Sequence, residues 1–117
     1  MSLHLELKDR IEEVYGEQLP GGVELKQDAL QLQFDSGLVL ELRFASAEEY
    51  SIHWLWGDAE LRIDTAPCHP GLKTQPNHLH DEEGQVRDDP LTTPGAAPWD
   101  NVCRVIDAVL ADPLLHS

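Results

Sequence analysis

Apolar and polar residues alternate along residues 50–64, with a single interruption at Gly57-Asp58. A period of two residues is typical of strands that bury one face. A Gly-Asp pair between two such runs predicts a tight two-residue turn, because glycine tolerates positive φ. The predicted hairpin places Trp54 and Ile63 on the buried face. It leaves three polar side chains together on the other face: His53, Arg62 and Asp64.

A second hairpin is predicted over residues 30–44. Leucine and phenylalanine alternate there with glutamine, glutamate and arginine on both sides of Asp35-Ser36-Gly37. Gly37 suits the left-handed position of a three-residue hairpin loop. Both hairpins therefore contribute an apolar face to one sheet.

Two segments show helical rather than strand periodicity. Residues 3–19 carry an apolar stripe at helical spacing and stop before Pro20-Gly21-Gly22, and residues 98–112 carry a second stripe that begins at a proline. Each stripe must be buried against another element. We therefore expect an α+β fold, a four-stranded antiparallel meander with an N-terminal and a C-terminal helix packed on one face.

The remaining pattern completes the expected organisation. Residues 1–117 are interpreted as a single domain, with the strands confined to about 23–65. Residues 66–97 lack periodicity and are rich in histidine, acidic residues and proline, so they are predicted to be loops. No stretch resembles a membrane span or the apolar region of a signal peptide, which favours a cytoplasmic location.

Charge narrows the choice of partner. The chain has 22 acidic and 8 basic residues, a formal net charge of −14. Nucleic-acid binding normally depends on cationic contacts to phosphate, so RNA is a substrate only if a local patch holds it. A basic protein partner is the easier expectation from charge alone.

Histidines concentrate in the middle of the chain. Four of the six lie between residues 50 and 80: His53, His69, His78 and His80. His78 and His80 are two residues apart, so in extended backbone their side chains point the same way. The predicted candidate site is therefore His53, Arg62 and Asp64 on the open sheet face, covered by the loops that contain the other three histidines.

The motifs in this region resemble those of the TumE family. They are Tyr50-x-x-His53-Trp54, Arg62-x-Asp64-x-Ala66-Pro67-x-His69-Pro70 and Pro76-x-His78-x-His80. The resemblance implies the toxin half of a two-gene toxin–antitoxin pair, with a cognate antitoxin as partner. The chain departs from the family pattern at Cys68, Asn77 and Leu79, where the family favours histidine, histidine and lysine.

Three functions are compatible with these residues. In the first, the protein is a toxin that cleaves RNA without metal. One histidine takes a proton from a ribose 2′-hydroxyl and another donates one to the leaving oxygen. Arg62 holds the phosphate, and Asp64 orients His53.

The second interpretation is a zinc site, whose ligands are drawn from His69, His78, His80 and either Cys68 or Asp64. The third is a non-catalytic, acidic protein-interaction module. The family resemblance favours the first, with catalytic candidates that span the hairpin and its exit loops: His53, Arg62, Asp64, His69, His78 and His80.

Overall fold

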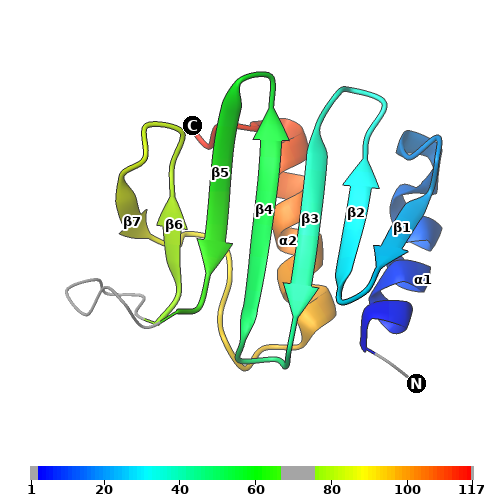
Figure 1. Ribbon diagram of the computed structural model, residues 1–117, viewed down its shortest axis with the longest axis horizontal. Coiled ribbons are helices and arrows are strands. Elements are labelled where there is room, and N and C mark those ends of the chain that lie inside the picture. Colours follow the sequence, from blue (N-terminus) through cyan, green and yellow to red (C-terminus); the bar gives the residue numbers. More distant parts are fainter. Residues whose placement is uncertain (1–2, 67–75, 117) are drawn as a thin grey trace.

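One antiparallel sheet forms the body of the protein in the computed structural model, which describes residues 3–66 and 76–116. The sheet has seven strands, and each pairs with the next along the chain (Figure 1). The strands are β1 (Val23–Lys26), β2 (Ala29–Gln33), β3 (Val39–Phe44), β4 (Tyr50–Trp56), β5 (Ala59–Asp64), β6 (His78–His80) and β7 (Val86–Asp88).

The expected four-stranded meander is therefore wrong, although the fold remains α+β. The central strands β2 to β5 match the predicted hairpins, and three short strands, β1, β6 and β7, extend the sheet at both edges. The turn from β1 to β2 lacks a glycine; its Gln27 has a φ of 51°. The strands β6 and β7 have three residues each. Runs this short show too little alternation to be distinguished from a loop.

Both helices cover one face of the sheet, as expected (Figure 1). The helix α1 (Leu3–Tyr15) is followed by a short 3-10 turn, η1 (Gly16–Gln18), and α2 (Pro98–Ala111) matches the second predicted helix closely. Their buried side chains join those of the strands in one apolar core. Neither helix in the described ranges is long and apolar enough to cross a membrane.

The predicted register of β4 and β5 is confirmed. His53 pairs with Arg62 and Trp54 with Leu61 across the two strands, and Gly57 turns the chain with a φ of 59°. Trp54 is fully buried, and its indole Nε1 donates a hydrogen bond of 2.8 Å to the Pro113 carbonyl after α2. The histidine and arginine therefore point away from the helices, onto what we call the open face.

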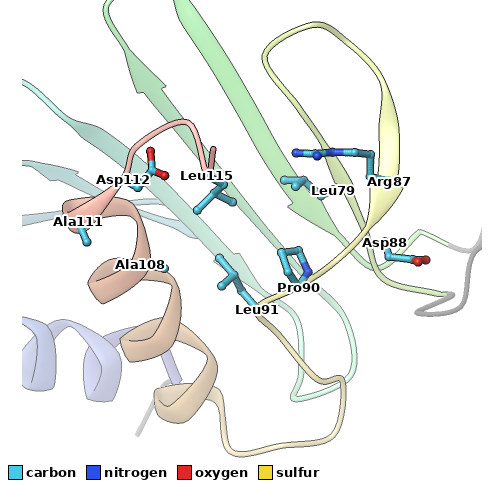
Figure 2. A pocket seen from close by; sticks show the side chains of 9 residues that line it. All are labelled: Leu79, Arg87, Asp88, Pro90, Leu91, Ala108, Ala111, Asp112 and Leu115. Atoms are coloured by element: carbon cyan, nitrogen blue, oxygen red, sulfur yellow. The ribbon is translucent and has the colours of Figure 1, made fainter. Parts of the chain in front are cut away.

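An apolar groove lies on the helix side of the sheet, between α2 and the strands β6 and β7 (Figure 2). Its volume is about 620 Å³. The lining is largely aliphatic, with three charged side chains: Leu79, Pro90, Leu91, Ala108, Ala111, Leu115, Arg87, Asp88 and Asp112. Leu79 borders this groove and is 1% exposed, so the lysine that the family favours at this position would place its charge against the core.

Candidate functional site

Three long polar side chains form a row across the open face. His53 on β4 pairs with Arg62 on β5, and Arg62 pairs with His80 on β6. Neighbouring strands lie about 4.8 Å apart, so the Cα atoms of the two histidines are separated by about 10 Å. The guanidinium of Arg62 thus comes from the strand between two imidazoles. Strand pairing brings His53 and His80 together although 26 residues separate them in the sequence.

Asp64 is the centre of the contacts at one end of this row. Its Oδ2 lies 2.9 Å from Arg62 Nε and 3.8 Å from His80 Nε2, and its Oδ1 lies 3.0 Å from His78 Nε2. The sequence predicts that Asp64 orients His53. The carboxylate that contacts His53 is instead that of Glu60, whose Oε1 lies 2.8 Å from His53 Nε2. Each partly exposed histidine of the row therefore has an acidic neighbour, Glu60 for His53 and Asp64 for His80.

The two β6 histidines are in direct contact. Their Nε2 atoms are 3.0 Å apart, and His80 Nε2 also lies 3.2 Å from Arg62 Nη2. The His78 Nδ1 atom is 3.2 Å from the Pro76 carbonyl oxygen. A carbonyl only accepts hydrogen bonds, so this Nδ1 carries a hydrogen and the Nε2 atom points at Asp64 and His80.

Exposure separates the roles that these side chains can take. The side chain of His78 is 2% exposed, whereas those of His53, His80 and Arg62 are 31%, 27% and 48% exposed. A molecule on the open face could therefore contact the three members of the row, whereas His78 is buried beside Asp64. The prediction that His78 belongs to a loop is wrong, because it is a buried residue of β6.

Two predicted site residues, Cys68 and His69, lie outside the described residues. Among the described ones, a three-residue set offers ligand atoms that all lie within 4.8 Å of one another: Asp64, His78 and His80. All three were among the ligands predicted for a zinc site from the sequence, in the alternative that uses Asp64.

A shallow depression opens beside Arg62 and His80. Its volume is about 390 Å³, and most of its other lining is acidic: Asp58, Glu60, Asp81 and Glu82. These side chains repel an anion at long range, and Arg62 is the arginine among them.

A buried polar network, not anticipated from the sequence, fixes the start of β6. The side chain of Asn77 donates hydrogen bonds of 2.8 Å to Asp89 Oδ2 and 3.0 Å to the Thr92 carbonyl. Thr92 Oγ1 also donates to Asp89 Oδ2, and it accepts a 2.7 Å bond from the Tyr50 hydroxyl. Burial, together with the nearby Asp89 charge, raises the pKa of Tyr50 and so keeps it a neutral donor.

From the opposite side of the sheet, this network is linked through the backbone to two residues of the site, His78 and Asp64. Asn77 precedes His78, and the Tyr50 backbone is bonded to Thr65, the residue after Asp64. The sequence predicts a loop rich in acidic residues here, yet Asp89 is 4% exposed. The available signal was Asp89-Pro90, a pair that favours turns, since Asp89 Oδ1 accepts hydrogen bonds from Leu91 N and Thr92 N.

Removing the Asn77 amide should therefore destabilise the fold. We expect Asn77→Ala to lower the free energy of unfolding by about 1–3 kcal/mol, because Asp89 loses a buried hydrogen-bond donor. Gln85→Ala is the matched control: this exposed amide belongs to the same segment, and its loss should cost less than about 0.5 kcal/mol. Denaturant unfolding measures both. Equal stability of the two variants would contradict the role assigned to the network.

Comparison with known proteins gives one family. A family model described as Toxin TumE matches residues 5–113. The match thus covers nearly the whole chain, further than the second half in which the motifs are found. No curated protein and no solved structure matches the chain.

Proposed function

Because the chain belongs to the TumE toxin family, we propose that it acts as the toxin of a toxin–antitoxin pair and that it cleaves RNA on the open face of its sheet. The family implies a cognate antitoxin as partner. The observation that supports RNA as the target most directly is the row His53–Arg62–His80. Two partly exposed imidazoles beside one guanidinium are suited to catalyse phosphodiester transfer to a 2′-oxygen, because they can serve as base, acid and phosphate ligand.

Arg62 would bind the scissile phosphate between the two histidines. Its planar guanidinium offers parallel donors to two phosphate oxygens, and nearly half of its side chain is exposed. The contact with Asp64 uses Nε and that with His80 uses Nη2. Asp64 thereby holds the guanidinium in place before RNA arrives.

The imidazoles of His53 and His80 would transfer the protons. One accepts the proton of the ribose 2′-hydroxyl as the 2′-oxygen bonds to phosphorus, and the bond from phosphorus to the 5′-oxygen breaks. The other donates a proton to that leaving oxygen. The products are a 2′,3′-cyclic phosphate and a 5′-hydroxyl, and the step consumes no water or metal ion.

Asp64 and His78 would act through their neighbours. His78 is buried with its Nε2 3.0 Å from His80 Nε2, and Asp64 contacts both histidines as well as Arg62. These contacts support a positioning role. The charge of −14 slows association with RNA, so we expect a site that engages few phosphates.

Growth of bacteria that express the chain without an antitoxin tests this proposal. We expect the wild-type chain to slow growth, and His53→Ala or His80→Ala to restore it, because each removes one proton-transfer group from the row. His116→Ala is the matched control, since this exposed histidine contacts Glu82 outside the row. Its toxicity should be retained.

Thermal unfolding of the purified variants separates loss of chemistry from loss of fold. Normal growth with the wild-type chain, or undiminished toxicity in both row variants, would contradict the proposal.

A further inference from the structure

We infer that Asp64, His78 and His80 also form a binding site for one divalent transition-metal ion, with zinc the best match to the ligand chemistry. The inference uses only the positions of these three side chains and does not depend on RNA cleavage. Two imidazole nitrogens and one carboxylate oxygen are ligands that zinc accepts, and three protein ligands leave one position open for water or another ligand.

The distances fit such an ion. Ligand atoms at about 2.0–2.1 Å from zinc in a tetrahedron are about 3.3 Å from one another. Two separations here are close to that value, 3.0 Å from His78 Nε2 to Asp64 Oδ1 and 3.0 Å between the two Nε2 atoms, and the three ligand atoms all lie within 4.8 Å of one another. Small side-chain adjustments therefore suffice to close the ligands around one ion.

The hydrogen bond at His78 Nδ1 orients the imidazole ring so that Nε2 can bind a metal ion. Metal-binding histidines commonly donate their second ring N–H to a carbonyl or carboxylate, which fixes the other nitrogen as the ligand. The His78 Nδ1 atom has this arrangement with the Pro76 carbonyl, at 3.2 Å. Its Nε2 then faces two further groups with lone pairs, Asp64 Oδ1 and His80 Nε2. Lone pairs that face one another repel unless a proton or a metal ion lies between them. A cation among these three atoms would therefore stabilise their arrangement.

The surroundings favour a cation as well. The depression next to His80 is lined by four acidic side chains, and Arg62 is the basic residue among its lining. Arg62 contacts Asp64 through Oδ2, whereas Oδ1 accepts a 3.1 Å hydrogen bond from Ala66 N and keeps its second lone pair for the ion. Its guanidinium also lies 3.2 Å from His80 Nε2, so it must turn toward solvent when the ion binds.

Metal binding and the proposed RNA cleavage would compete, and this consequence alone rests on the proposed function. A metal bound to His80 Nε2 occupies the lone pair that proton transfer at that nitrogen needs. Displacement of Arg62 would also weaken phosphate binding. We therefore expect zinc to inhibit the toxin.

Cobalt and zinc titration of the chelator-treated full chain tests the site. Co²⁺ should bind at one ion per chain with visible d–d absorption, and Zn²⁺ should displace it and raise the unfolding temperature. His80→Ala and Asp64→Asn should each weaken binding at least tenfold. His116→Ala, which removes a histidine outside the set, should bind as the wild type does. Less than one ion per chain in the wild type, or unchanged affinity in both ligand variants, would overturn the inference.

The effect of zinc on RNA cleavage is measured separately. Cleavage should fall in proportion to zinc occupancy, and a rate that is unchanged or higher at full occupancy would refute the competition. A chain that binds Co²⁺ but cleaves no RNA would support the metal site and refute the proposed function.

Discussion

Arg62→Ala is expected to lower RNA cleavage by about 10²–10³-fold, the loss typical when one preorganised donor to the transition-state charge is removed. Arg62 lies between the two partly exposed histidines of the row, and it contacts both Asp64 and His80. Arg62→Lys should recover only part of the rate, because an ammonium group cannot replace the planar pair of donors. Initial rates of cleavage of a short RNA measure both variants.

Arg43→Ala is a closely matched control for this substitution. Arg43 lies on the same open face, on β3, with a side-chain exposure of 52% against 48% for Arg62, and it also pairs with acidic residues. It lies outside the histidine row, so its loss should leave the cleavage rate within about twofold, less than 0.5 kcal/mol of the activation free energy. Both substitutions remove a partly exposed ion pair and should cost at most about 1 kcal/mol of stability. Equal losses of activity in the two variants would show that general charge, rather than the row, determines the rate.

Trp54→Ala should lower the free energy of unfolding by about 3–5 kcal/mol, as expected for truncation of a large buried aromatic side chain. Trp54 is fully buried in the core and donates a hydrogen bond to the Pro113 carbonyl. Its loss leaves a cavity between the sheet and the end of α2, and leaves that carbonyl without its indole donor. Denaturant unfolding measures the change.

Trp56→Ala provides the comparison on the same strand. Trp56 is 36% exposed, near the turn at Gly57, so its truncation should cost less than about 1.5 kcal/mol. Trp54→Ala should also abolish toxicity by unfolding the protein, whereas Arg62→Ala should abolish it in a folded chain. If Trp54→Ala is no less stable than Trp56→Ala, the assignment of the buried face is incorrect.

The sequence predicted the centre of this fold better than its edges. Alternation over residues 50–64 was long enough to give both the register and the face of every side chain, so the pairing of His53 with Arg62 was correct. Strands β6 and β7 are too short for periodicity to detect. They form because β5 offers a sheet edge to which they add, a tertiary effect that a local pattern does not contain.

The candidate site was predicted only in part, because local periodicity gives the direction of a side chain but not its partners on other strands. His78 and His80 were expected to point together, and their Nε2 atoms are in contact. Asp64 contacts these histidines rather than His53 because β5 pairs with β6. The sequence did not predict this pairing. The burial of Asp89 depends on hydrogen bonds from Asn77, which precedes β6, and from Thr92, which is itself bonded to Tyr50 of β4. In the sequence alone, Asp89 resembles any other acidic residue in a polar segment.

The most direct test of the central claim is product analysis with a DNA oligonucleotide that contains a single ribonucleotide, incubated with the purified chain in excess chelator. The row mechanism predicts cleavage after the ribonucleotide, with a 2′,3′-cyclic phosphate and a 5′-hydroxyl detected by mass spectrometry. Cleavage should be lost in His53→Ala and His80→Ala and retained in His116→Ala. Cleavage of the all-deoxy control, or an intact ribonucleotide substrate after incubation with the folded wild-type chain, would contradict the account.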